Sequence, residues 1–116
     1  MKRPGQIAIL RFPHADLHTG KPRPVLLVAP VPGPYDDWLV CMISTQIQQA
    51  VADFDEVIDE SDEDFHLAGI KVKSAVRIGR LAVASADVLE GAIGAISAGR
   101  LERIRKNLSR WIGGES

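Results

Sequence analysis

Two polar segments of the chain carry the side chains best suited to electrostatic or acid–base chemistry. The first, residues 14–24, places two histidines, a lysine and an arginine ahead of an apolar run: His14, His18, Lys21 and Arg23. Prolines flank Arg23 on both sides, so its backbone is restrained and presenting its guanidinium costs less entropy. Because a guanidinium matches the oxygens of an anion in two-point contacts, this loop is a candidate anion-binding site. A solvated surface loop is the alternative.

The two histidines of this loop are candidates for proton transfer. Histidine titrates near neutrality, which suits a general base or acid. His14 and His18 are four residues apart, but they lie in a segment rich in proline and glycine rather than on a helix. No further metal ligand is nearby, so we expect no metal site there. The chain also has no phosphate loop, zinc spacing or nucleophile elbow, and we expect no cofactor.

The second polar segment follows the apolar run 38–43. It consists of Ser44, Thr45 and Gln46. Successive residues of a strand point to opposite faces, so we expect at most one of Ser44 and Thr45 to share a site with Arg23. The alternative is that these residues form only the polar rim of a sheet.

Short strands must position both segments. Strand length, β-branched content and turn residues predict seven strands, at residues 6–12, 25–29, 38–44, 54–58, 72–76, 79–84 and 91–96. Gly79 interrupts the chain between the fifth and the sixth. Many short strands followed by one amphipathic helix indicate a mainly β fold, a small barrel with a C-terminal helix packed on it. The length of 116 residues fits one domain, residues 1–116.

The C-terminal helix is the clearest element of the pattern. Apolar residues recur at helical spacing from Leu101 to Ile112, Ser97 is a candidate N-cap, and Gly113 follows the last turn. Five basic residues spread around more than one face of this helix: Arg100, Arg103, Arg105, Lys106 and Arg110. We therefore expect them to be solvated rather than to form a nucleic-acid-binding stripe.

Two of the predicted strands, 25–29 and 38–43, are apolar on both faces. One small barrel with a single helix is not expected to cover both faces completely. A symmetric dimer would bury the excess apolar surface.

Composition and charge indicate an ordinary globular protein. The chain is 46% hydrophobic and 25% charged, and no apolar run reaches the length of a membrane span. We expect a cytoplasmic protein without a membrane partner. The net charge of −1 hides a segregation, because residues 53–64 hold eight of the fifteen acidic residues. A solvated acidic loop is the expected use of this stretch. The single cysteine, Cys41, lies in an apolar run and is expected to be a buried, inert thiol.

The order of these segments resembles the MazF/PemK toxins. The resemblance rests on the opening strand 5–13, on the arginine–proline pair that enters the second strand (20–28), and on the third strand ending in Ser/Thr and Gln (40–46). Segments 68–71, 74–77 and 80–81 resemble the later strands, and the helix after Ser97 also fits. The similarity covers roughly residues 5–112 in the correct order.

The resemblance implies an SH3-like barrel, a homodimer and a toxin of a type II toxin–antitoxin system. It implies an endoribonuclease that cuts single-stranded messenger RNA, a cognate antitoxin as partner, and DNA binding together with that antitoxin. The family's catalytic arginine falls on Arg23 and its hydroxyl residue on Ser44. We expect the remaining polar candidates to bind substrate: His14, His18, Lys21, Thr45, Gln46, Arg77 and Arg80.

The chain departs from the family pattern at two positions. Gly79 and Ser85 stand where many members carry acidic residues, which leaves the general base unassigned. Cleavage without a metal requires attack by the neighbouring 2′-OH, so the substrate would be RNA rather than DNA. Two alternatives remain from other classes of function. One is a catalytically weak barrel that acts as a protein-binding module; the other is a toxin that poisons a topoisomerase through residues near the terminal helix.

Overall fold

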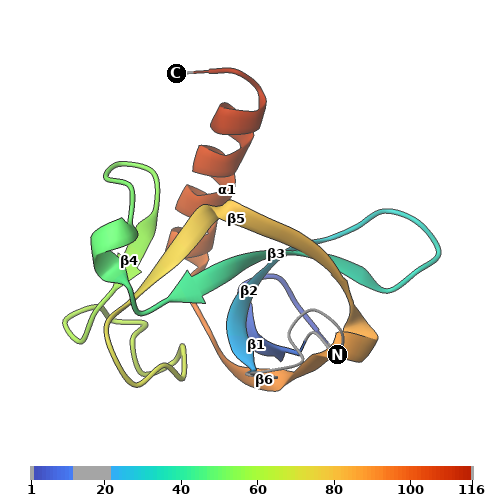
Figure 1. The fold of residues 1–116 in the computed structure, drawn as a ribbon, viewed down its shortest axis with the longest axis horizontal. Coiled ribbons are helices and arrows are strands. Elements are labelled where there is room, and N and C mark those ends of the chain that lie inside the picture. Colours follow the sequence, from blue (N-terminus) through green and yellow to red (C-terminus); the bar gives the residue numbers. More distant parts are fainter. Residues whose placement is uncertain (1, 12–21, 116) are drawn as a thin grey trace.

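A computed structural model describes residues 2–11 and 22–115 of the chain. His14, His18 and Lys21 lie outside the described residues. Six strands form one antiparallel sheet in the order β4-β5-β3-β2-β1-β6 (Figure 1). The strands are β1 (Gln6–Leu10), β2 (Arg23–Pro30), β3 (Asp37–Ser44), β4 (Glu56–Ile58), β5 (Ser74–Ser85) and β6 (Leu89–Ala95). The helices are the 3-10 turns η1 (Ile47–Gln49) and η2 (Ala86–Val88), and the α-helix α1 (Ala98–Ile112).

The mainly β prediction with a C-terminal helix is confirmed, but two predicted strands are one. Residues 72–76 and 79–84 fall within the continuous strand β5. Met42 of β3 pairs with Arg77, whereas its neighbour Cys41 pairs with Leu81, so residues 78–80 form a bulge without β3 partners. A bulge bends a strand and changes its twist without ending it. Gly79 therefore marks a bend of β5 rather than a break.

The predicted closed barrel is not confirmed, because β4 and β6 stand at opposite edges of the sheet. Other groups cover these edges. The guanidinium of Arg100 donates to the carbonyl of Val57 in β4 at 3.1 Å. At the other edge, the N–H of Ala95 in β6 donates to the carbonyl of Leu67 at 2.8 Å. These hydrogen bonds satisfy backbone groups at the two edges that would otherwise be unpaired in an open sheet.

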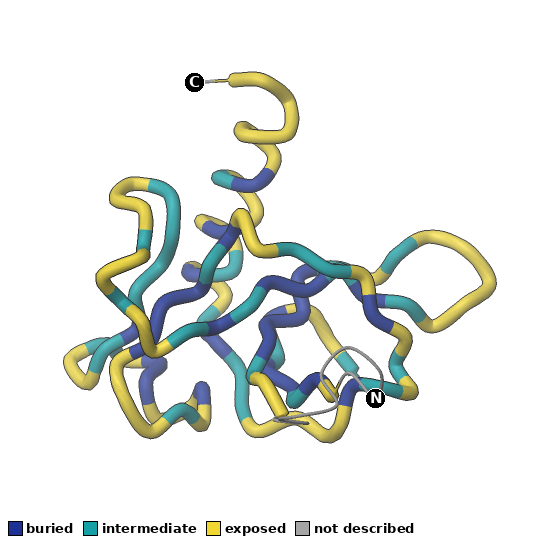
Figure 2. The backbone as a smooth tube through the Cα atoms, in the orientation of Figure 1, coloured by how far each residue is buried: buried dark blue, intermediate teal, exposed yellow. Residues whose placement is uncertain are grey.

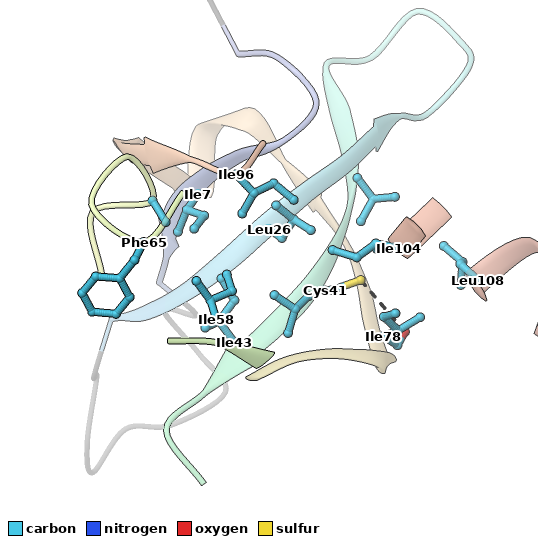
Figure 3. Close-up of a cluster of buried hydrophobic side chains, with 13 residues drawn as sticks. Ile7, Leu26, Cys41, Ile43, Ile58, Phe65, Ile78, Ile96, Ile104 and Leu108 are labelled. Carbon is cyan, nitrogen blue, oxygen red and sulfur yellow. Dashed lines mark hydrogen bonds between the residues drawn. The ribbon is translucent and has the colours of Figure 1, made fainter. Parts of the chain in front are cut away.

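Two buried clusters occupy the two sides of the curled sheet. One contains residues from β1 to β5 together with Ile104 and Leu108 of α1 (Figure 3). The other contains Ala8, Leu10, Val25, Leu27, Trp38, Val40, Ala84 and Leu89. Strand β2 contributes to both: Leu26 and Val28 face the first cluster, and Val25 and Leu27 face the second.

Both apolar faces of β2 are thus covered within a single chain. Val25 to Leu27 are completely buried, and Val28 nearly so. The expectation that one chain leaves these faces partly uncovered is wrong for residues 25–28, because the sheet curls around one cluster while α1 packs on the other. In β3, Leu39 and Met42 remain half-buried. A dimer therefore needs support other than excess apolar surface on β2.

Helix α1 has the predicted ends. The Oγ of Ser97 accepts a hydrogen bond from the N–H of Arg100 at 3.2 Å, the geometry of an N-cap. The helix ends at Ile112, and Gly114 follows with a φ of 78°. Its last turns extend away from the strands and are exposed (Figure 2). Within residues 2–11 and 22–115, no helix has the length and apolar character needed to cross a membrane.

Candidate functional site

A pocket of about 530 Å³ collects most of the polar side chains that the sequence singled out. It lies where β2 begins, where β3 ends and where β5 bulges. Its polar lining consists of Arg23, Ser44, Thr45, Gln46, Gln49, Arg77 and Arg80, and its apolar lining of Pro22, Pro24, Met42 and Ile43. Six predicted site residues therefore share one cavity, Arg23, Ser44, Thr45, Gln46, Arg77 and Arg80.

Strand register explains why Arg23 and Ser44 meet. Val25 pairs with Met42 across the antiparallel strands β2 and β3, and continuing this register by two residues brings Arg23 opposite Ser44. Met42 also pairs with Arg77 on its other side. Directly opposed residues of neighbouring strands point to the same face of a sheet. The two arginines and the serine therefore approach the pocket from one face.

Ser44 is the last residue of β3 and is half-buried. Its Oγ accepts a hydrogen bond from the N–H of Gln46 at 3.0 Å. Within the described part of the chain, no acceptor takes the hydroxyl hydrogen, which is left to donate into the pocket. Thr45 also lines the pocket, contrary to the expectation that only one of the two residues would. Strand alternation stops at Ser44, because Thr45 lies in a bend.

Arg77 is held by side chains from another part of the chain. Its Nε donates to Oδ2 of Asp55 at 3.0 Å, and its Nη1 donates to Oε1 of Gln49 at 3.3 Å. Sequence reasoning missed Asp55, because it treated the acidic stretch as a solvated loop. No local signal distinguishes Asp55 from its acidic neighbours, since its burial depends on a partner 22 residues away.

The charge of the pocket is positive. Arg23, Arg77 and Arg80 line it, and the carboxylate of Asp55 lies behind Arg77. Arg23 and Arg80 are exposed to solvent. Such a concentration of guanidinium groups suits a phosphodiester or a carboxylate.

A second group of acidic and basic residues forms a structural cluster away from the pocket. Arg100 is buried and donates from Nε to Asp64 Oδ2 at 2.8 Å and from Nη1 to Glu56 Oε1 at 3.0 Å. The expectation that this arginine is solvated is wrong, because these carboxylates accompany it into the interior. Arg103, which also contacts Glu56, is exposed as expected.

These contacts shift the pKa values of the cluster. Burial alone would raise the pKa of Asp64, but hydrogen bonds from Arg100 and from the N–H of Ser97, with the charge of Arg100, hold it below its ordinary value. Burial alone would lower the pKa of Arg100, but its hydrogen bonds to Asp64 and the charges of Asp64, Glu56 and Asp62 raise it above its ordinary value. Elsewhere, burial and then the charge of Asp55 raise the pKa of the Cys41 thiol to about 12. The prediction that Cys41 is buried is confirmed, and a thiol with this pKa stays protonated near neutral pH.

Candidate metal ligands do not gather in the described residues. Within residues 2–11 and 22–115, no group of three or more histidine, cysteine, aspartate or glutamate side chains has an arrangement that could hold a metal ion.

The sequence matches the family described as PemK-like, MazF-like toxins of type II toxin–antitoxin systems over residues 3–112. The chain belongs to this toxin family. The resemblance stated from the strand order is therefore confirmed. Curated proteins give no match.

Solved structures of MazF toxins share the fold. MazF from Deinococcus radiodurans is 20% identical with a TM-score of 0.67, and the alignment covers 97% of this chain and 96% of that one. The MazE–MazF structure from the same organism is 18% identical with a TM-score of 0.68, and the alignment covers 99% of this chain and 97% of that one. An endoribonuclease from a mycobacterial species, in complex with its cognate antitoxin, is 15% identical with a TM-score of 0.66. That alignment covers 97% of this chain and 96% of the other.

Proposed function

We propose that this MazF/PemK-family toxin is a metal-independent endoribonuclease that cuts single-stranded RNA. The observation that carries the proposal is the convergence of Arg23, Ser44 and Arg77 on one open, positively charged pocket. Family membership and the endoribonuclease among proteins of the same fold support it.

The reaction proceeds by transfer within the RNA strand. The 2′-oxygen attacks the adjacent phosphorus and loses its proton to a base. The bond from phosphorus to the 5′-oxygen breaks, and that oxygen takes up a proton, leaving a 2′,3′-cyclic phosphate and a 5′-hydroxyl. The transition state gains negative charge on the phosphoryl oxygens, where preorganised donors are most effective.

Arg23 supplies the positive charge closest to this transition state and stabilises the departing oxygen. The hydroxyl of Ser44 donates to a non-bridging oxygen. Thr45, Gln46, Arg77 and Arg80 bind the neighbouring nucleotides, together with Lys21. His14 and His18 are the candidates for the general base, since histidine titrates near neutrality.

The proposal includes two partners. A cognate antitoxin restrains the toxin. In support, two proteins of this fold have structures as a MazE–MazF pair and in complex with a cognate antitoxin. The protein acts as a homodimer, in which two basic pockets lie near a shared groove. The pair of toxin and antitoxin binds DNA, and the protein works in the cytoplasm.

The decisive experiment incubates the purified protein with a long single-stranded RNA and with DNA of the same sequence, in EDTA and with added Mg²⁺. We expect cleavage of RNA alone, at the same sites in EDTA, with 5′-hydroxyl and 2′,3′-cyclic phosphate or 3′-phosphate ends. Cleavage that requires the added metal, or equal cleavage of DNA, would contradict the proposal. A folded protein that binds its antitoxin but leaves RNA intact would instead favour a binding module.

A further inference from the structure

One carboxylate behind the pocket binds three separate groups. The side chain of Asp55 is only 1% exposed. Its Oδ2 accepts hydrogen bonds from Nε of Arg77 at 3.0 Å and from the N–H of Val51 at 2.9 Å. Its Oδ1 accepts one from the N–H of Ile78, in the bulge of β5, at 2.8 Å. All three partners are donors, so the site suits a carboxylate and not an amide.

These bonds orient the guanidinium of Arg77. Its Nε is bound by Asp55 and one hydrogen of its Nη1 by Gln49, so the side that faces the protein is occupied. Among residues 2–11 and 22–115, the Nη2 group and the second hydrogen of Nη1 have no acceptor, and they can bind a ligand in the pocket that Arg77 lines. A guanidinium fixed in this way loses less entropy on binding a phosphate than a free side chain does.

The turn that carries Asp55 is anchored to the helix α1 through the neighbouring Phe54. The N–H groups of Phe54 and Asp55 both donate to the carbonyl of Val51, closing a turn in which Asp53 has a φ of 63°. The carbonyl of Phe54 accepts a hydrogen bond from Nδ2 of Asn107 at 2.9 Å. The ring of Phe54 meets that of Trp111 edge-on, with centroids 5.8 Å apart. The turn therefore has support from both its backbone and its aromatic side chain.

We propose that Asp55 is a positioning residue, which fixes Arg77 to bind an RNA phosphate beside the one held by Arg23 and Ser44. The proposal rests on the proposed RNA cleavage. Asp55 touches no substrate in it and acts through Arg77 alone. If Asp55 positions Arg77, loss of its charge weakens RNA binding. Electrostatics alone predicts the opposite, because removing a negative charge near a polyanion site strengthens binding.

Two substitutions separate these effects. Asp55→Asn and Asp53→Asn remove the same charge from the same turn, but Asp53 is exposed and does not line the pocket. Asparagine also tolerates the positive φ of residue 53. We expect kcat/KM on the cleaved RNA to fall about 10- to 100-fold in Asp55→Asn, the effect of losing a charge-assisted contact, and to be unchanged or slightly raised in Asp53→Asn. A rate for Asp55→Asn at or above that of wild type overturns the proposal.

A double-mutant cycle then distinguishes positioning from general loss of structure. In an Arg77→Ala background, Asp55→Asn should reduce kcat/KM by no more than about 2-fold, since both changes remove one interaction. The salt dependence of binding gives a second readout, using a fully 2′-O-methylated oligonucleotide that contains a mapped cleavage site. Each lost phosphate contact lowers the slope of log K against log salt by about 0.7. We expect this decrease in both single variants and no further decrease in the double variant; additive losses would contradict the proposal.

An NMR measurement tests the positioning without RNA. The Nε–Hε signal of Arg77 should exchange slowly with water in wild type and in Asp53→Asn, and rapidly in Asp55→Asn. If Asp55→Asn does not fold, Gln49→Ala removes the other acceptor of Arg77 from an exposed position and should raise the Kd for the oligonucleotide. Rapid exchange of Arg77 in wild type refutes the positioning. Slow exchange in a protein that leaves RNA intact refutes the proposed function instead.

Discussion

Arg23 begins β2, Ser44 ends β3 and both line the pocket, yet they offer different interactions to a phosphate. The guanidinium contributes a full charge and two parallel donors, whereas the hydroxyl contributes one neutral hydrogen bond. Charge-assisted bonds are roughly twice as strong as neutral ones. We therefore expect Arg23→Ala to lose about 10²-fold or more in kcat/KM on RNA, and Ser44→Ala to lose less.

The matched control for Arg23→Ala is Arg11→Ala. Arg11 is also exposed, but it pairs with Glu90 and does not line the pocket. Its loss should leave cleavage unchanged while circular dichroism confirms that each variant is folded. Equal rates for Arg23→Ala and wild type would remove Arg23 from the mechanism.

The lowered pKa of Asp64 makes part of the stability depend on pH. A carboxyl whose pKa is lower in the folded protein stabilises the fold above its unfolded pKa, near 3.9, and stops doing so as the pH falls through its folded pKa. Urea unfolding of wild type and Asp64→Asn should therefore show a constant difference in free energy between pH 5 and 7. That difference should shrink below about pH 4. A difference independent of pH down to 2 would show that the charge of Asp64 does not matter.

At the scale of elements, Arg100 connects the start of α1 to β4 and to the loop after it. Its side chain is 6% exposed and contacts Glu56, Asp62 and Asp64. Replacement by methionine removes the guanidinium from all three and leaves the buried carboxylate of Asp64 without its ion-pair partner, so we expect the free energy of unfolding to fall by about 3 kcal/mol or more. Arg103→Ala breaks an ion pair to the same Glu56, but from a 57% exposed side chain, and should cost less than about 1 kcal/mol. Similar losses in urea unfolding would contradict the burial argument.

Strand β6 contacts the loop before β5 so closely that glycine is required on both sides of the contact. A Cβ on Gly94 would collide with the carbonyl groups of Leu67 and Ala68, and one on Gly69, which has a φ of 73°, would collide with the carbonyl of Ile93. Gly94→Ala should lower the free energy of unfolding by about 2 kcal/mol or more, since rigid backbone cannot yield.

Gly99 provides the control for this substitution. It lies in the first turn of α1, and its added Cβ would have only an ordinary contact with Arg103. Because alanine is the better helix former, Gly99→Ala should be neutral or should stabilise the protein by up to about 1 kcal/mol. Thermal unfolding compares the two variants. An undiminished Tm for Gly94→Ala would mean that the edge of β6 is free to move.

At the scale of the whole molecule, we expect the positive pocket to bind an antitoxin as well as RNA. Its lining combines three arginines with apolar side chains such as Met42 and Ile43. We expect the inhibitory segment to be disordered when free, rich in acidic and apolar residues, and bound at the groove near Arg23. The antitoxin should therefore slow RNA cleavage competitively. Tight binding of antitoxin with undiminished cleavage would show that the two sites are separate.

Assembly is a separate prediction, because burial of β2 within one chain does not require a partner. Light scattering at micromolar concentration should give twice the mass of one chain, which is 12.6 kDa. A strictly monomeric protein that cleaves RNA would show that one pocket suffices.

Local patterns in the sequence determined most of the secondary structure and pointed to two residues of the candidate site. Strand alternation and the N-cap at Ser97 depend on neighbours along the chain, so β1, β2, β3 and α1 could be predicted closely. Arg23 and Ser44 were predicted because each stands at the end of a recognisable strand. Family resemblance then gave both residues a role.

Only the tertiary structure decided which charges are buried and how the sheet ends. Asp55 and Arg77 are 22 residues apart, and Asp64 and Arg100 are 36 apart, so nothing local distinguishes them from solvated charges. Likewise, Gly79 marks a bulge rather than a strand end because Asp55, from a distant turn, binds the N–H of Ile78. These outcomes depend on packing between segments that are remote in sequence, where the cost of burying a charge is offset only by a partner that the fold brings near.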